Sequence, residues 1–179
     1  MENNSANYIS FFGKDNMNGW LSNFDTYAQF IDIEGNKFTS TEQFFMSRKA
    51  KQWPSPKNDI IFKAILNSKN PKEAKTLGRS VENFNEIEWV NVRFEIMKEG
   101  LRYKFSNQNA KTIEYRRKLL ATNNSILIEA SPFDKIWGIG MKMESFNKLN
   151  QNDKNNIIQE RNLLGKALMD IRTETILIE

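Results

Sequence analysis

S-T-E-Q-F-F-M-S-R-K-A, residues 40–50, predicts the first helix of the chain. Ser40 is the expected N-cap and Gln43 takes the third helical position, which together make a capping-box pattern. Glu42 and Lys49 are seven residues apart, so their side chains leave the same helix face, with Cα atoms about 10 Å apart. Two long side chains at this spacing can converge on one small molecule. The plain alternative is that both are solvent-exposed and share no ligand.

Proline and turn residues mark the other elements. Trp53-Pro54-Ser55-Pro56 ends the first helix, because proline cannot continue it, and Pro71 is placed to begin another. Residues 141–159 are polar and rich in asparagine, and their structure cannot be assigned. The predicted helices cover about 59–66, 71–78, 86–105, 111–120 and 163–171, and the predicted strands cover 8–12, 28–33 and 126–129.

The predicted helix over about 86–105 is the longest, and its apolar residues recur at steps of three and four. These residues are expected to face the core: Ile87, Val90, Phe94, Met97 and Leu101. Several helices and a few short strands predict an α+β fold, predominantly α. We expect residues 8–179 to form a single compact domain around a small β-sheet, and residues 1–7 to be disordered or loosely held.

The composition excludes several classes of chemistry, since the chain of 179 residues has no cysteine and no histidine. Disulfides, thiolate catalysis, Ser-His catalysis and most zinc sites are excluded, so proton chemistry falls to carboxylates, lysine, tyrosine or water. We expect no metal and no cofactor. No apolar run approaches the ~20 residues that span a bilayer, and the N-terminus lacks the apolar core of a signal peptide, which predicts a cytoplasmic protein with no membrane partner. The net charge of +4 permits nucleic-acid binding but does not demonstrate it.

Glu42 and Lys49 suit different steps of one reaction. Glu42 lies in the opening turn of its helix, where the helix dipole favours the charged carboxylate. Such a group is better suited to activating water, or to stabilising positive charge on a sugar ring, than to acting as an acid. Lys49, if partly desolvated, would have a lowered pKa and could attack an aldehyde or an anomeric carbon.

Two other segments have residues suited to binding a flat ligand. In D-K-I-W-G-I-G, residues 134–140, Trp137 could stack on a base while Asp134 accepts hydrogen bonds from its amino groups. The alternative is a tight turn with Trp137 in the core. In W-L-S-N-F, residues 20–24, Ser22 and Asn23 could orient a ligand or simply cap a turn.

These motifs, in this order, resemble the NADAR superfamily, also called YbiA-like. The resemblance extends over most of residues 8–172. Its matching segments are L-S-N-F from Leu21, T-S-T-E-Q-F-F-M-S-R-K-A from Thr39, E-A-K-T-L-G-R from Glu73, W-V-N-V-R-F-E-I-M-K-E-G-L-R-Y-K-F from Trp89, L-L-A-T from Leu119, D-K-I-W-G-I-G from Asp134 and N-L-L-G-K-A-L-M-D-I-R from Asn162.

The resemblance implies a compact, mostly helical domain that hydrolyses N-glycosidic bonds between ribose and a base-like nitrogen. It implies that Glu42, in the S-x-E motif, is catalytic. Gln43 departs from the family, since many relatives have histidine there. The residues and the resemblance together give the catalytic candidates Glu42, Lys49 and Asp134, and the substrate-binding candidates Ser22, Asn23, Phe24, Phe45, Arg79, Arg93, Lys104, Trp137, Gly138 and Asn162.

The expected substrate is ADP-ribosylated guanine, with nucleic acid carrying the modified base and an ADP-ribosyltransferase toxin encoded nearby as implied partners. Phosphorylated ribosylamino-pyrimidine intermediates of riboflavin synthesis are the alternative. In either case we expect the ribosyl group in a cleft between the first helix and the 134–140 loop, with a phosphate held by Arg79, Arg93 or Lys104. A non-catalytic ADP-ribose or NAD-binding module, and a structural nucleic-acid-binding protein, are alternatives of other classes.

Overall fold

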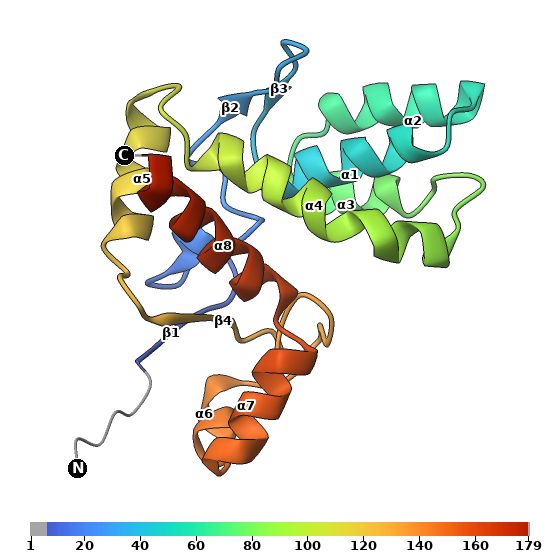
Figure 1. The fold of residues 1–179 in the computed structure, drawn as a ribbon. Coiled ribbons are helices and arrows are strands. Elements are labelled where there is room, and N and C mark those ends of the chain that lie inside the picture. The colour runs from blue at the N-terminus through green and yellow to red at the C-terminus, as the bar shows by residue number, and fades with distance from the viewer. Residues whose placement is uncertain (1–6, 179) are drawn as a thin grey trace. The chain divides into compact units, whose positions relative to one another are not determined.

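The computed structural model describes residues 7–178, so residues 1–6 of the predicted loose N-terminus lie outside the described part. The chain divides into two compact units. The helical unit is Asn23–Arg117, and the terminal unit combines Met1–Ser22 with Lys118–Glu179. Figure 1 shows that helices dominate both units, which confirms the predicted α+β fold, predominantly α.

The helical unit is built around α1, Thr41–Gln52, which contacts α2, α3 and α4. These helices appear in cyan to green in Figure 1. Helices α2, α3 and α4 cover Pro56–Leu66, Pro71–Gly78 and Glu86–Lys104, respectively. Helix α5, Ala110–Leu120, begins in this unit and ends in the other. A short antiparallel hairpin, β2 over Phe30–Ile31 and β3 over Lys37–Phe38, completes the unit. Only β2 remains of the predicted strand over 28–33.

Side-chain caps set the helix starts in this unit. The side chains of Ser40, Ser55, Asn70 and Asn85 each accept a backbone N–H from the first turn of α1, α2, α3 and α4, respectively. Proline also occupies the first helical position of α2 and of α3, where its missing N–H removes no helical hydrogen bond. The prediction therefore located most of these starts correctly, and placed the start of α2 three residues too late.

The predicted apolar stripe of α4 is wrong over its first two turns. Ile87 is 77% exposed and Val90 is 45% exposed, whereas Trp89 is only 6% exposed. Farther along, Met97 and Leu101 are fully buried, as predicted. Trp89 is buried because its indole packs against other aromatic rings. Its ring centroid lies 5.0 Å from that of Phe45 and 6.2 Å from that of Trp53.

The core of the helical unit is aromatic. Phe30, Phe38 and Phe44 are buried together, and the ring of Phe44 lies 5.1 Å from that of Phe38 in an edge-to-face arrangement. Gly100 lets α4 approach α1 closely, because a Cβ there would lie 2.7 Å from the ring of Phe44. This approach fixes α1, the helix with Glu42 and Lys49, against α4.

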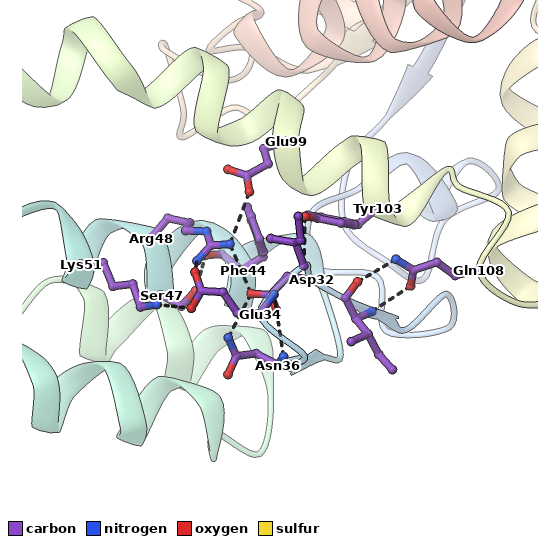
Figure 2. A network of polar contacts seen from close by, with 12 residues as sticks. Asp32, Glu34, Asn36, Phe44, Ser47, Arg48, Lys51, Glu99, Tyr103 and Gln108 are labelled. Atoms are coloured by element: carbon purple, nitrogen blue, oxygen red, sulfur yellow. Dashed lines mark hydrogen bonds and ion pairs between the residues drawn. The ribbon is translucent and has the colours of Figure 1, made fainter. Parts of the chain in front are cut away.

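An ion-pair network joins the hairpin to α1 and α4, as Figure 2 shows. The guanidinium of Arg48 contacts Asp32 at 3.2 Å, Glu34 at 2.9 Å and Glu99 at 3.3 Å. Lys51 also pairs with Glu34, and Asp32 accepts the backbone N–H of Glu34 at 3.0 Å within the hairpin turn. The network accounts for two of the cations of α1 and leaves Lys49 outside it.

In the terminal unit, β1 over Tyr8–Phe11 pairs in parallel with β4 over Ile126–Glu129, and α8 contacts β4. Helix α8 covers Leu163–Ile178 and is longer than predicted. The polar segment 141–159 forms α6, Met143–Asn147, and most of α7, Gln151–Glu160; a short 3-10 helix, η1, covers Gly19–Leu21. Within residues 7–178, no helix is both long and apolar enough to cross a lipid bilayer.

Candidate functional site

Helix α1 places Glu42 and Lys49 on one unbroken helix. The Ser40 hydroxyl accepts the N–H of Gln43 at 3.1 Å, and the helix continues to Gln52. Because the helix is continuous between the two residues, their side chains emerge from the same side, about two turns apart. The predicted continuous helix between Glu42 and Lys49 is therefore confirmed, and their joint action on one ligand stays a prediction.

Glu42 is a buried acidic residue, only 4% exposed. Its backbone N–H donates to the carbonyl oxygen of Asn23 at 3.1 Å, which holds the first turn of α1 against the segment that precedes the hairpin. Asn23 Oδ1 and Thr41 Oγ1 are also buried, and neither atom has a hydrogen-bond partner within residues 7–178. Buried polar atoms of this kind normally bond to water or to a ligand. The surroundings of Glu42 therefore offer polar atoms for one.

Lys49 is half-buried in an aromatic setting. Its ammonium nitrogen lies 4.1 Å from the ring centroid of Phe84 and 5.9 Å from that of Trp89. Burial lowers the pKa of Lys49, the Glu86 carboxylate opposes this effect, and the positive charge of Arg79 adds to it. Lys49 is therefore a lysine whose neutral form is favoured relative to that of an exposed lysine.

Further charges lie near Lys49. Arg93 of α4 contacts Glu86 at 3.5 Å, and Arg79 is exposed at the C-cap of α3. Lys49 interacts electrostatically with both Glu86 and Arg79. The structure thus brings together three of the predicted site residues, Lys49, Arg79 and Arg93, with Glu86 as the acidic member.

The aromatic rings of Trp53, Phe84 and Trp89 are the part of the Lys49 surroundings that the sequence reasoning missed. Trp53 packs edge-on against Phe84 at 5.3 Å, and Trp89 packs against Phe45 at 5.0 Å. Phe45 was predicted to bind substrate and is 3% exposed. The four rings come from two stretches that are far apart in the sequence, residues 45–53 and residues 84–89. The only signal for them was the aromatic residues that precede and begin the longest predicted helix.

Gln43 has a structural role here. Its Oε1 accepts the backbone N–H of Thr39 at 2.7 Å, and its Nε2 donates to the carbonyl oxygens of Ile65 at 2.9 Å and Leu66 at 3.1 Å. The side chain therefore joins the start of α1 to the end of α2. An amide can make both kinds of contact at once, since it has a donor and an acceptor.

Lys104 is in the interior of the helical unit, with its side chain 1% exposed. Its ammonium lies 3.9 Å from Asp25 and 5.6 Å from the ring centroids of Phe105 and Tyr115. The Tyr115 hydroxyl donates to Asp25 at 3.1 Å. Burial lowers the pKa of Lys104 to about 8, and Asp25 opposes part of that effect. These contacts suit a structural lysine, and its predicted contact with a phosphate stays a prediction.

Lys104 predicts a pH dependence of stability. Its pKa falls from 10.5 to about 8 on folding, so the unfolded chain binds the extra proton between these values. Stability should therefore rise by about 3 kcal/mol from pH 8 to 10.5 and be lost again as pH falls through 8. Urea unfolding of the native chain and of Lys104→Met across this range measures the effect. Lys104→Met should lack the rise in stability, and Lys63→Met, at an exposed position, should keep it. If the stability of Lys104→Met rises with pH as much as that of the native chain, Lys104 is not the source of the effect.

The remaining helical-unit candidate is Phe24, which is half-buried, with the Lys75 ammonium 5.4 Å from its ring centroid. The other candidates lie in the terminal unit. Asp134 accepts the backbone N–H groups of Ile136 and Trp137, both at 2.8 Å, so its carboxylate shapes the turn of its own loop. Trp137 is half-buried. Their predicted contacts with substrate stay predictions.

Three further candidates in the terminal unit are buried, and two of them have contacts that suit structural roles. Gly138 is required by a close approach, since a Cβ there would lie 2.8 Å from the carbonyl oxygen of Glu129. Asn162 has a φ of 60° and bonds to β4 twice, accepting from the N–H of Glu129 at 3.0 Å and donating to the carbonyl of Leu127 at 2.9 Å. Ser22 is 4% exposed at the end of η1. The predicted substrate contacts of all three residues stay predictions.

Comparisons with known proteins agree with this chain's motifs. The NADAR domain model matches residues 10–175. The chain is 40% identical over 139 residues to N-glycosidase R617 of Acanthamoeba polyphaga mimivirus, covering 77% of this chain and 75% of that protein. It is 30% identical over 178 residues to the chloroplastic riboflavin biosynthesis protein PYRR of Zea mays, covering 96% of this chain and 26% of that protein.

A solved structure supports the same relationship. The NMR structure of the E. coli protein YbiA aligns with a TM-score of 0.69 and 26% sequence identity, covering 96% of this chain and 86% of that chain. The matched family segment includes α1 with Glu42 and Lys49 as well as the 134–140 loop. The chain therefore belongs to the NADAR domain family.

Proposed function

We propose that this protein hydrolyses the bond between the ribose of ADP-ribose and a base nitrogen, with ADP-ribosylated guanine in nucleic acid as its substrate. The broader class follows from the family: the chain is a hydrolase that acts on N-glycosyl bonds, the activity for which its mimivirus relative is named. The choice of ADP-ribose and guanine is the step that goes beyond this class.

The observation that carries the proposal is the continuous helix α1, which has a buried carboxylate at its start and a half-buried amine two turns later. Glu42, 4% exposed, lies in the first helical turn, where the positive end of the helix dipole favours a negative charge. A carboxylate in this position suits a reaction in which positive charge develops on a sugar.

The reaction then divides between the two residues. As the bond between the anomeric carbon and the base nitrogen breaks, its electron pair stays with the nitrogen and the carbon gains oxocarbenium character. Glu42 stabilises this charge or directs the water whose oxygen bonds to the carbon. The base nitrogen takes a proton, either from Lys49 or from water. In a second route, the neutral amine of Lys49 bonds to the anomeric carbon as the base leaves with the electron pair of the broken bond. The carbon then releases the ring oxygen as a hydroxyl to form an imine, and water hydrolyses the imine to free the sugar and the amine.

The cations near Lys49 support a substrate that contains phosphate. Arg79 is exposed and Arg93 is half-buried, and both belong to the charged group around Lys49 and Glu86. Lys49, Arg79 and Arg93 contribute three positive charges to this group and Glu86 contributes one negative charge, which favours an anionic ligand. The diphosphate of ADP-ribose is an anion that such a group can bind.

A second substrate class has support of its own. The similarity to the riboflavin biosynthesis protein PYRR covers 96% of this chain. A phosphorylated ribosylamino-pyrimidine also has an N-glycosidic bond and a phosphate, so the same residues could act on it. The two substrates differ in the base and in the number of phosphates.

Side-by-side assays test the proposal. An oligonucleotide with ADP-ribosylated guanine and a phosphorylated ribosylamino-pyrimidine are each incubated with the protein, and the products are identified by mass spectrometry. We expect free ADP-ribose and restored guanine from the oligonucleotide. Consumption of the pyrimidine alone would move the protein to the second substrate class. Binding without release of either base would overturn the catalytic proposal and favour a ligand-binding module.

A further inference from the structure

Phe84 is an aromatic residue at the surface, and its ring contacts the ammonium group of Lys49, the candidate catalytic lysine. Its side chain is 39% exposed, although it is large and apolar. The Lys49 ammonium lies 4.1 Å from its ring centroid, within the range at which a cation is attracted to an aromatic face. Trp53 packs edge-on against the same ring at 5.3 Å. Phe84 is thus held between a second ring and the amine.

The segment before Phe84 is fixed by a buried asparagine. Asn58 of α2 is 1% exposed, and its side chain donates to the carbonyl oxygen of Glu82 at 3.1 Å and accepts the N–H of Glu82 at 2.9 Å. It also donates to the carbonyl oxygen of Trp53. One side chain therefore ties the loop between α3 and α4 to the end of α1. Asn83 follows with a φ of 58°, a left-handed conformation that directs the chain into Phe84.

We propose that Phe84 is a positioning residue for Lys49, with its ring holding the ammonium in place and the Asn58-clamped loop holding the ring. This inference rests on the catalytic role of Lys49 in the proposed function. It adds a residue that takes no part in making or breaking bonds but sets the position and the charge of the amine.

Two opposed effects of the ring make the proposal testable. The ring face attracts the charged ammonium, whereas the cover that the side chain provides disfavours charge. The charged groups that act on Lys49 from the neighbouring elements are Glu86 of α4 and Arg79 at the end of α3. They remain in place in Phe84 variants, so a change in the ionisation of Lys49 reports on the ring itself.

The experiment compares Phe84→Leu, Phe84→Ala and Phe84→Tyr. The pKa of Lys49 is read from the pH dependence of its acetylation by acetic anhydride, followed on the Lys49 peptide by mass spectrometry. Phe84→Leu keeps the cover and loses the ring, so this pKa should fall by about half a unit. Phe84→Ala opens the site to water, so the pKa of Lys49 should rise. Phe84→Tyr keeps both features and should resemble the native chain, and the Lys51 peptide is the internal control.

Activity on the substrate identified above gives the second measurement. We expect Phe84→Leu and Phe84→Ala to lower kcat about tenfold with little change in KM. Phe84→Tyr should keep kcat close to that of the native chain. Unchanged acetylation profiles in both Leu and Ala variants would overturn the positioning role, whatever the activity. If the profiles shift as expected but no variant changes kcat, the positioning contact stands and the catalytic role of Lys49 fails. The acetylation assay needs no substrate, so the two failures are distinguishable.

Discussion

Replacing Glu42 with Gln is expected to lower the rate of base release by about 10²–10⁴-fold while the protein stays folded. The glutamine side chain has the same shape as that of glutamate and lacks only its negative charge. If the carboxylate stabilises the oxocarbenium-like carbon or directs water, the loss should appear in kcat, because that charge develops only in the transition state. Single-turnover assays with the ADP-ribosylated oligonucleotide measure the chemical step directly.

The control for Glu42→Gln is Asp59→Asn, which neutralises an exposed carboxylate in the first turn of α2. Its activity should stay within about twofold of the native rate. Urea unfolding and ligand affinity of Glu42→Gln should both stay close to native, which separates a chemical effect from a folding one. A Glu42→Gln protein that is folded, binds ligand and turns over at the native rate would show that Glu42 is not catalytic.

Helix starts could be predicted from the sequence because the signals for them are local. Ser40 is the N-cap of α1 and bonds to Gln43 in its first turn, and Asn70 precedes Pro71 at the start of α3. A cap needs only a few neighbouring residues, so the sequence contains all of its geometry. The same holds for the spacing of Glu42 and Lys49, which follows from the helix alone.

The buried face of α4 could not be predicted in the same way. Apolar periodicity favoured Ile87 and Val90, yet Trp89 is the buried residue in those turns. The choice depends on Phe45 and Trp53, which pack against Trp89 from α1 and its C-cap. A periodic pattern cannot include such partners, because they come from another part of the chain.

The setting of the candidate site was hidden for the same reason. The sequence indicated that Lys49 could be partly desolvated, but the ring that covers it, Phe84, comes from the loop before α4. That loop is held by Asn58 of α2, a residue whose sequence context indicates only a helix start. The surroundings of Lys104 were hidden as well. Its burial beside Asp25 depends on a contact between residues that are far apart in the sequence.

Replacing Lys49 with Met is expected to lower base release by about 10²–10⁴-fold if the amine takes part as an acid or as an imine-forming nucleophile. Methionine keeps an unbranched apolar chain between the rings of Phe84 and Trp89 and removes the charge. Lys51→Met is a matched control on the same helix, because Lys51 also lies over an aromatic ring, 4.6 Å from the Phe62 centroid, and pairs with an acid. Activity near native in Lys49→Met would exclude both routes.

The pH dependence of kcat in the native protein separates the two routes of Lys49. Burial lowers its pKa, so the amine changes charge closer to neutral pH than an exposed lysine does. A lysine that protonates the leaving base must be charged, and kcat then falls as pH rises through that pKa. A lysine that forms an imine must be neutral, and kcat then rises over the same range. In that second case, borohydride added during turnover should attach the reduced sugar to the Lys49 peptide of the native chain and to no peptide of Lys49→Met.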